Sequence, residues 1–289
     1  MSAAKSDEAS FSFFSPAEIE ATKEVIIDQP FYCGKNLGKG VDLVVVVMSA
    51  IYKFSQREAI RKTWGKVAKM RGIRVLFFLG ETFDERTQAN VVRENELNSD
   101  IIQVAFHDHY YNNTLKAIAI LRSLSRYCKK VKFVLKSDDD MLLNIQIASD
   151  FAKSNRYAKR TIFGLIYRNA AVNRSRFSKW FVPKSVYRAN RYPSYATGAV
   201  YMFTGDAIEP LLNACVNDLN PLYIDDVYIT GIVAQKAGVR RNWANFVKLH
   251  YADKLDAWSY ATYLGTHGYD SEKLIDRWNL IHAHVKCET

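Results

Sequence analysis

The chain has 289 residues, of which 48% are hydrophobic and 13% aromatic, which is enough for one large α/β domain or two small ones and excludes extensive disorder. Lysine and arginine total 40 against 30 acidic residues, so the formal charge is +10. No apolar run approaches the roughly 18–20 residues that a membrane-spanning helix needs. The N-terminal stretch also lacks the apolar segment of a signal peptide. Taken alone, the sequence therefore predicts a soluble chain.

The first 150 residues alternate between apolar runs and helical patterns. Residues 1–41 have no periodicity and end in GKNLGKG, which predicts a flexible lead-in. Four apolar runs then predict strands at 42–48, 74–80, 100–106 and 132–136, and the intervening patterns predict helices at 54–65, 84–98 and 114–128. This alternation predicts an α/β fold with a doubly wound, mostly parallel sheet. In such sheets ligands bind beyond the carboxyl ends of the strands.

The second half of the chain is less regular. Further strands are expected at 161–166 and 200–204, and further helices at 205–216 and 225–238. Between them, residues 168–191 contain seven basic residues, no acidic residue and several aromatic rings. Such a segment can be a solvated loop, a nucleic-acid surface, or a site where rings stack on sugars and cations neutralise phosphates. The pattern alone leaves all three open.

Three consecutive carboxylates, Asp138, Asp139 and Asp140, follow the fourth predicted strand in FVLKSDDDMLLN, with Lys136 just before them. Like charges this close repel one another, and desolvation at a strand end penalises ionisation further. A divalent metal that carries a nucleotide diphosphate would compensate, because a hard cation takes oxygen ligands from carboxylates and phosphates. The alternatives are a helix-capping cluster, an acidic surface turn, or the D-x-D of a haloacid dehalogenase-type phosphatase, which places that motif after its first strand.

Other polar residues give weaker signals. Asp225 and Asp226 open a predicted helix, where they can cap it or supply a general base. The cysteines are widely spread without a C-x-x-C pair, which argues against a zinc ribbon, and their even number permits two disulfides without establishing them. They are Cys33, Cys128, Cys215 and Cys287. Asn112 and Asn173 begin N-glycosylation sequons, which matter only in the secretory pathway.

Five motifs occur in a family-specific order: REAIRKTWG, YYNNTLKAIAILRSLSRYC, FVLKSDDDMLLN, KW…YPSYATGAVYMFT and DDVYITGIVAQKAGV. In these motifs the chain resembles the β-1,3-galactosyltransferase and β-1,3-N-acetylglucosaminyltransferase-type enzymes, glycosyltransferase family 31, over roughly residues 42–287. The resemblance implies a single GT-A-type domain over 42–289, with a nucleotide-binding half at about 42–144 and an acceptor-binding and catalytic half at about 145–289. It departs from the family at Asp225, where Glu is usual, and at Ala199, where a second glycine is common.

The resemblance also implies an activity. It is the inverting, Mn²⁺-dependent transfer of galactose or an N-acetylhexosamine from a UDP-sugar to a glycan hydroxyl on a glycoprotein or glycolipid, forming a β-1,3 linkage. It further implies a location on the lumenal side of the Golgi membrane, held by an N-terminal signal anchor for which this sequence has no candidate. The alternatives are a catalytically silent domain that binds nucleotide sugar or glycan, and a nucleic-acid-binding protein, which we do not expect.

The family pattern assigns a role to individual residues. Asp226 would be the catalytic base, and Asp140 and His267 would ligate the metal. The remaining residues would bind the donor (Asp138, Asp139, Arg57, Arg61 and Lys136), border the acceptor (Trp180, Tyr195 and Asp225) or carry glycans (Asn112 and Asn173).

Overall fold

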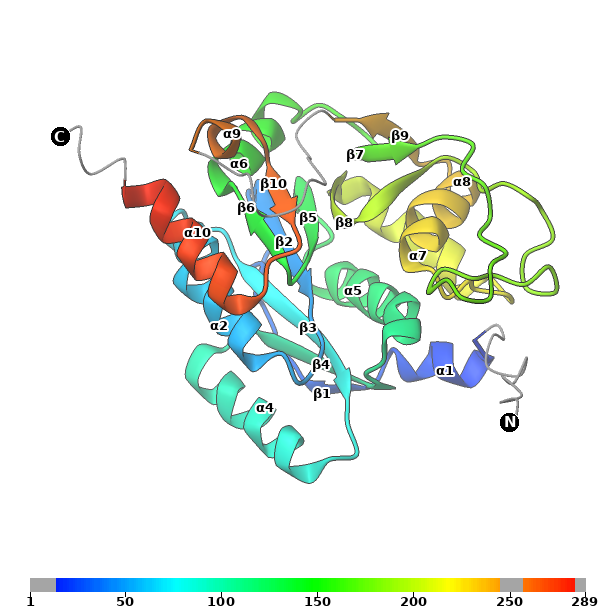
Figure 1. Ribbon diagram of the computed structural model, residues 1–289, viewed down its shortest axis with the longest axis horizontal. Helices are drawn as coiled ribbons and strands as arrows, with labels where there is room; N and C mark the ends of the chain where they lie inside the picture. Colours follow the sequence, from blue (N-terminus) through cyan, green and yellow to red (C-terminus); the bar gives the residue numbers. More distant parts are fainter. Residues whose placement is uncertain (1–13, 245–256, 284–289) are drawn as a thin grey trace.

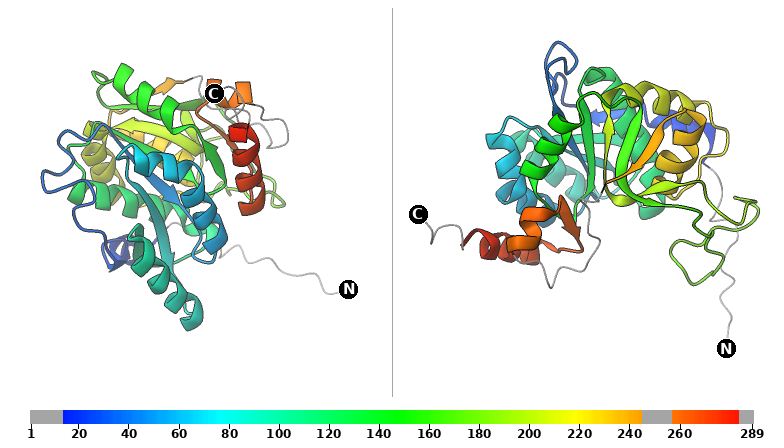
Figure 2. Two further views of the ribbon diagram at one scale, coloured as in Figure 1. Left: turned by 90° about the vertical axis from the view of Figure 1, so that its left-hand side faces the viewer. Right: turned by 90° about the horizontal axis from the view of Figure 1, so that it is seen from above.

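A computed structural model describes residues 14–244 and 257–283 of the chain. At its centre lies an eight-stranded sheet with the strand order β1-β4-β3-β2-β5-β8-β7-β9, and helices pack on both of its faces (Figure 1; Figure 2). The strands of this sheet are β1 Val25–Ile27, β2 Leu43–Met48, β3 Val75–Glu81, β4 Ile101–His107, β5 Phe133–Asp138, β7 Thr161–Tyr167, β8 Tyr195–Thr204 and β9 Arg240–Trp243. A second sheet joins β6 Met141–Leu143 to β10 Gly265–His267.

The helices fill the connections between strands. They are α1 Pro16–Ala21, α2 Phe54–Lys62, α3 Trp64–Met70, α4 Glu85–Asn98, α5 Asn113–Tyr127, α6 Ile145–Ser154, α7 Ile208–Val216, α8 Ala234–Lys236, α9 Ala257–Thr262 and α10 Ser271–Ala283, with 3₁₀ turns η2 Tyr110–Asn112 and η3 Gly205–Ala207 and the π-helix η4 Val227–Val233. Within the described residues, no helix has the combined length and apolarity that crossing a bilayer requires.

The first half of the sheet confirms the predicted βα alternation. Strands β2, β3 and β4 run parallel to one another, and β2 also pairs in parallel with β5. Every residue of β2 is buried. Val44 and Val46 pack into one core, while Val45 and Val47 pack into the other. The strand therefore needs a continuous apolar run, because both of its faces are covered by helices.

The second half of the sheet was only partly predicted. Strand β8 lies antiparallel between β5 and β7, and it begins at Tyr195 instead of the expected residue 200. The additional residues, YATGA, carry no strong alternating pattern. They become a strand because β7 pairs with them at Tyr195 and Ala196, which is a tertiary effect that local propensity does not reveal.

The flexible lead-in expected over residues 1–41 is wrong from residue 14 onward. Helix α1 begins at Pro16 with a capping box between Ser15 and Glu18, and β1 adds to the sheet edge antiparallel to β4. Cys33 forms a disulfide with Cys128, which closes this segment onto the end of α5. Residues 1–13 lie outside the described part of the chain.

The other two cysteines do not complete a second disulfide within the described residues. Cys215 is a buried free thiol on α7, and Cys287 lies outside the described residues.

The small second sheet brings the C-terminal part of the chain to the end of β5. Strand β10 pairs antiparallel with β6, so that His267 stands opposite Met141, the residue after Asp140. Helix α10 then packs along α2, as Figure 1 shows. The edge of the sheet where β5 ends is thereby enclosed by segments that are far apart in the sequence.

Candidate active site

Three potential metal ligands meet where β5 ends. Asp138 is the last residue of β5, Asp140 lies in the turn between β5 and β6, and His267 ends β10. One ligand atom from each of these residues lies within 4.8 Å of the others, and Nε2 of His267 is 3.1 Å from Oδ2 of Asp140. The pairing of β10 with β6 therefore brings His267 next to Asp138 and Asp140.

The chemistry of this cluster fits a divalent cation. Oδ1 of Asp140 is buried and has no hydrogen-bond partner within the described residues. Burial by itself would raise the pKa of Asp140, but the hydrogen bond from His267 and the charges of His267 and Lys53 lower it overall. The same hydrogen bond raises the pKa of His267. Two carboxylates and an imidazole, with one carboxylate oxygen unsatisfied, suit a divalent cation.

The middle carboxylate, Asp139, points away from this cluster. Its Oδ2 accepts a hydrogen bond from Ser49 Oγ at 2.8 Å, and its Oδ1 accepts one from Lys53 Nζ at 3.0 Å. Its backbone carbonyl accepts from Gln56 Nε2 at 2.9 Å. Asp139 is 5% exposed. The residue therefore fastens the acidic turn to the segment after β2 and has no oxygen turned to the metal ligands.

Lys136 joins the acidic turn to β8. Its ammonium donates to Oδ1 of Asp138 at 2.5 Å and to the carbonyl of Gly198 at 2.6 Å, and its side chain is 2% exposed. Desolvation would lower the pKa of Lys136, but the charges of Asp138 and Asp225 raise it, so the residue stays cationic. Desolvation raises the pKa of Asp138 to about 6 even though Lys136 opposes the shift.

Asp226 accepts hydrogen bonds from two backbone N–H groups, one of which is that of Gly198. Its Oδ2 accepts from the N–H of Gly198 at 3.0 Å, and its Oδ1 accepts from the N–H of Val227 at 2.7 Å. A Cβ at position 198 would lie 3.3 Å from Cβ of Asp226, so glycine permits this close approach. Desolvation, and then the charge of Asp225, raise the pKa of Asp226. Asp226 precedes the π-helix η4, a form of helix that often occurs at functional sites.

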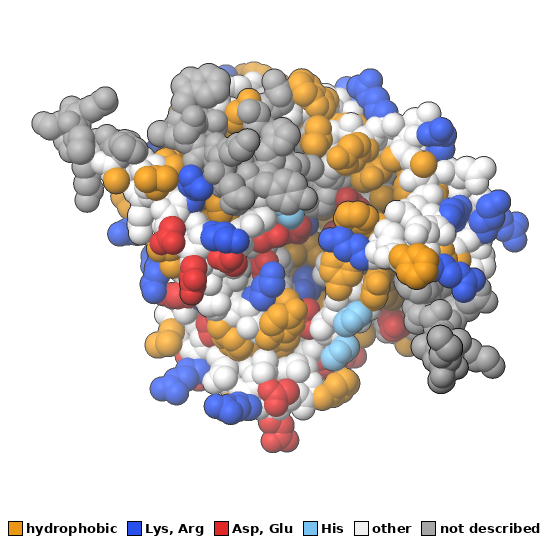
Figure 3. Space-filling model, viewed as in Figure 1, with side chains coloured by type: hydrophobic (Ala, Val, Ile, Leu, Met, Phe, Trp, Pro, Cys, Tyr) orange, Lys and Arg blue, Asp and Glu red, His pale blue; other side chains and the backbone are white. Residues whose placement is uncertain are grey.

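A rim of aromatic and cationic side chains lies beside these carboxylates. Lys179 Nζ lies 4.7 Å from the ring of Trp180 and 5.8 Å from that of Tyr110. Desolvation, and then the charges of Asp225 and Asp226, raise the pKa of Tyr110 to about 12. Figure 3 shows acidic side chains gathered near the middle of one face, with Lys and Arg side chains next to them.

Tyr195 lies on the β8 side of the site, near the expected base. It is half-buried, and its ring packs against that of Tyr167 at 5.7 Å between centroids. Desolvation, and then the charge of Asp226, raise the pKa of Tyr195 to about 12. The charge of Asp226 therefore acts on Tyr195, and that of Asp225 acts on Asp226, while the ring of Trp180 contacts Lys179.

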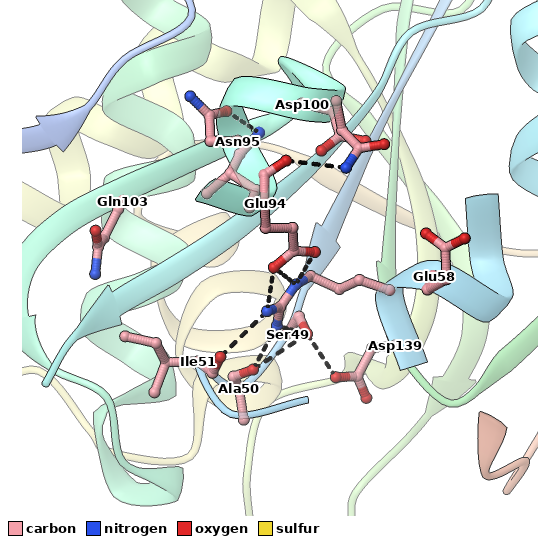
Figure 4. Close-up of polar contacts among 12 residues, drawn as sticks. Ser49, Ala50, Ile51, Glu58, Glu94, Asn95, Asp100, Gln103 and Asp139 are labelled. Atoms are coloured by element: carbon pink, nitrogen blue, oxygen red, sulfur yellow. Dashed lines mark hydrogen bonds and ion pairs between the residues drawn. The ribbon is translucent and has the colours of Figure 1, made fainter. Parts of the chain in front are cut away.

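The expected role of Arg57 in donor binding has to be corrected, because its guanidinium is not free to contact a nucleotide. Its side chain is fully buried, and it donates to the carboxylate of Glu94 from Nε at 2.9 Å and from Nη2 at 2.6 Å. Its remaining N–H groups donate to the turn after β2, at Ser49 Oγ, Ala50 O and Ile51 O. Figure 4 shows Glu94 and these three residues around one guanidinium group, with Asp139 next to Ser49. A guanidinium has five N–H groups, and here all are used inside the protein.

Arg61 is directed to the same network. It donates to Asp100 from Nε and Nη2, both at 2.8 Å, and to Glu94 from Nη1 at 2.7 Å. Its guanidinium also lies 4.9 Å from the centroid of the Phe77 ring. The structure therefore does not bring Arg61 to the carboxylate cluster. Arg57 fixes the turn after β2 to α4, and Arg61 links α2 to α4 and to Asp100.

The two sequon asparagines hydrogen-bond within the protein. Nδ2 of Asn112 donates to the carbonyl of His107 at 2.9 Å, and Nδ2 of Asn173 donates to Ser178 Oγ at 2.9 Å. Both side chains are partly exposed. Glycosylation at either asparagine stays a prediction.

Three residues of the site were not predicted from the sequence: Tyr110, Gly198 and Gln56. Tyr110 and Gly198 lie within the quoted family motifs YYNNTLK and YPSYATGAVY, which is a signal that could have been used. Gln56 lies just before REAIRKTWG and gave no signal, because an isolated glutamine on a helix is usually a solvated residue. Its contacts appear only in the folded chain.

Comparison with known proteins agrees with this geometry. A family model described as Galactosyltransferase matches residues 55–244. Beta-1,3-galactosyltransferase 1 of Mus musculus is 29% identical over 271 residues, covering 91% of this chain and 81% of the relative. Beta-1,3-galactosyltransferase 5 of Pan paniscus is 34% identical over 201 residues, covering 68% of this chain and 66% of the relative. The chain therefore belongs to the galactosyltransferase family, and its α/β sheet is the fold class expected from the sequence.

Two solved structures are more distant. The galactosyltransferase LgtC, in complex with donor and acceptor sugar analogs, is 12% identical with a TM-score of 0.40, covering 83% of this chain and 95% of LgtC. A glycosyltransferase involved in glycosylation of the major capsid of PBCV-1 is 11% identical with a TM-score of 0.38, covering 82% of this chain and 98% of that one. At these values the likeness says nothing about the activity of this chain.

Proposed function

We propose that this protein is an inverting hexosyltransferase that moves galactose or an N-acetylhexosamine from a UDP-sugar to a glycan hydroxyl, forming a β-1,3 linkage. The observation that carries the proposal is the connection from Asp138 through Lys136 and the peptide of Gly198 to Asp226. This connection holds the candidate donor site and the candidate base in one rigid unit. Membership of the galactosyltransferase family supports the same reaction class.

Asp226 is the general base in this proposal. It accepts the proton of the acceptor hydroxyl as that oxygen attacks the anomeric carbon from the face opposite the leaving UDP, and one displacement of this kind inverts the configuration. The N–H groups of Gly198 and Val227 each hold one of its oxygens, so the carboxylate presents a fixed lone pair. Its raised pKa makes it a better proton acceptor than an ordinary aspartate.

Asp138, Asp140 and His267 would hold Mn²⁺ together with the diphosphate of the donor. The ion would act as a Lewis acid that neutralises the negative charge on the departing diphosphate. Lys136 keeps Asp138 in place, and Asp139 keeps the turn in place through Ser49. Trp180, Tyr195 and Asp225 would border the acceptor sugar, because aromatic faces stack on sugar rings and carboxylates accept from sugar hydroxyls.

We also assign the protein to the lumenal side of the Golgi membrane. The disulfide between Cys33 and Cys128 supports this assignment, because disulfides persist in the oxidising secretory pathway and are rare in the cytosol. The two sequons would be modified in the same pathway.

The test is UDP release from UDP-galactose, UDP-N-acetylglucosamine and UDP-N-acetylgalactosamine, each with Mn²⁺ and a panel of glycan acceptors. Transfer from one donor, followed by linkage analysis of the product, would identify the sugar and the bond. Binding of UDP without turnover under every donor would favour a catalytically silent domain. Absence of both UDP binding and turnover would contradict the proposal. In the Asp140→Ala variant we expect UDP affinity to become independent of Mn²⁺.

A further inference from the structure

The candidate metal ligands come from two segments that no covalent bond holds close together. Asp138 and Asp140 belong to the turn between β5 and β6, and His267 belongs to the turn after β10. The backbone N–H groups of Gly268 and Tyr269 each donate to the carbonyl of Asp140 at 3.0 Å. Together with the antiparallel pairing of β10 and β6, these contacts join the two turns through their backbones.

A second link is made by one buried side chain on α2. Nε2 of Gln56 donates to the carbonyl of Asp139 at 2.9 Å and to the carbonyl of Tyr269 at 3.1 Å. Both partners are carbonyl oxygens, so only the amide nitrogen, with its two N–H groups, can satisfy them. Gln56 is 5% exposed, and it lies beside a hollow of about 410 Å³ that Asp140 also lines.

The helix that carries Gln56 is itself held firmly against the site. Its neighbour Arg57 is fixed to Glu94 and to the turn after β2, and Lys53, just before α2, donates to Asp139. On its outer side α2 packs along α10, the helix that follows His267. The side chain of Gln56 therefore extends from α2 to the two turns that carry the ligands and donates a hydrogen bond to each.

We propose that Gln56 is a positioning residue that sets the separation of His267 from Asp138 and Asp140, and thereby the affinity of the site for Mn²⁺. This proposal rests on the metal site described under Proposed function. Residues that orient metal ligands without touching the metal change metal affinity by about 10–100-fold when they are replaced. Gln56 meets that description because each of its two hydrogen bonds ends on a residue next to, or two positions from, a ligand.

The test compares Gln56→Met with Gln103→Met. Both glutamines are buried and each amide nitrogen donates to a backbone carbonyl, but Gln103 on β4 donates to the carbonyl of Gly80 and exchanges hydrogen bonds with Gln88, away from the two turns. Methionine fills nearly the same volume without a donor. The Mn²⁺ dissociation constant is measured from the electron paramagnetic resonance signal of free Mn²⁺, with no substrate present.

We expect Gln56→Met to weaken Mn²⁺ binding by about 10–100-fold and Gln103→Met to leave it unchanged. We also expect hydrogen exchange at the amides of Gly268 and Tyr269 to become faster in Gln56→Met only. Gln56→Asn keeps the amide but shortens it by one methylene, and it serves as the test variant if Gln56→Met does not fold.

Unchanged Mn²⁺ affinity in a folded Gln56 variant would overturn the proposal while leaving the metal site intact. Equal weakening in the Gln103 variant would overturn it too, because a general loss of stability would then explain both. If the wild-type protein itself binds no Mn²⁺, the metal site under Proposed function fails and this proposal fails with it.

Discussion

The carboxylate of Glu94 on α4 accepts hydrogen bonds from Arg57 on α2 at 2.9 and 2.6 Å, and the arginine side chain is wholly buried. The pair connects two helices of successive βα units. Through the other N–H groups of Arg57 it also fixes the turn that holds Asp139. Charge buried in this way is stable only while both partners are present, because a single buried ion loses its hydration without compensation.

We expect Glu94→Gln to lower the free energy of unfolding by about 3–5 kcal/mol, since it leaves the charge of Arg57 uncompensated. Urea denaturation followed by tryptophan fluorescence measures this loss. Glu96→Gln, an exposed residue on the same helix, is the control and should change stability by less than about 0.5 kcal/mol. A Glu94 variant as stable as the control would show that the pair contributes nothing to folding.

Asp226→Asn should reduce kcat by about 10²–10⁴-fold, because the amide cannot accept the proton of the acceptor hydroxyl. The affinity for UDP with Mn²⁺ should stay close to that of the wild type, since Asp226 is not among the proposed metal ligands. UDP release and UDP binding are measured on the same preparation. Near-normal turnover would contradict the role of Asp226 as base.

The pH dependence of kcat/KM should report the raised pKa of Asp226. The base works only when ionised, so activity is fully present above this pKa and is lost as the pH falls through it. Because desolvation and Asp225 raise the pKa of Asp226, the acidic limb should lie at a higher pH than an ordinary aspartate, with a pKa of about 3.9, would give. A rate that stays constant down to that ordinary value would argue against Asp226.

Trp180→Ala should raise KM for the acceptor and leave KM for the donor nearly unchanged. The expected loss corresponds to about 1 kcal/mol or more of ring contact, or roughly fivefold or more in KM. Tyr157→Ala is a matched control, because Tyr157 is also exposed and carries a cation–π contact, with Arg156 at 4.8 Å. Tyr157 precedes β7, and the first residues of β7 pair with the Phe203 end of β8, away from Tyr195. An equal effect of both changes on KM would remove Trp180 from the acceptor site.

Much of the fold of the first 144 residues could be predicted from the sequence. Its strands are continuous apolar runs such as LVVVVM, and its helices carry clear patterns, so local properties and tertiary fold agree there. The three aspartates were recognised for the same reason, because a charge cluster after a buried strand conflicts with its surroundings unless something compensates it.

The roles of Arg57 and Gln56 could not be predicted in this way. Both lie in or next to the motif REAIRKTWG, which predicts one polar helix. The sequence does not indicate which residues of that helix face the core. An arginine near an expected phosphate site suggests a phosphate contact. The carboxylate of Glu94, which pairs with the guanidinium of Arg57, comes from the next βα unit. Only the packing of α4 against α2 decides between the two uses.

The amino-acid sequence by itself determined the βα order, the acidic turn after β5 and the family of the protein, because each depends on residues adjacent in the chain. The tertiary structure decided the direction of β8, the pairing of His267 with the turn after Asp140, and the approach of Asp226 to Gly198. These features join segments from distant parts of the chain. Their free energy comes from strand pairing and burial that no local pattern encodes, and for that reason the structure was needed to assemble the site.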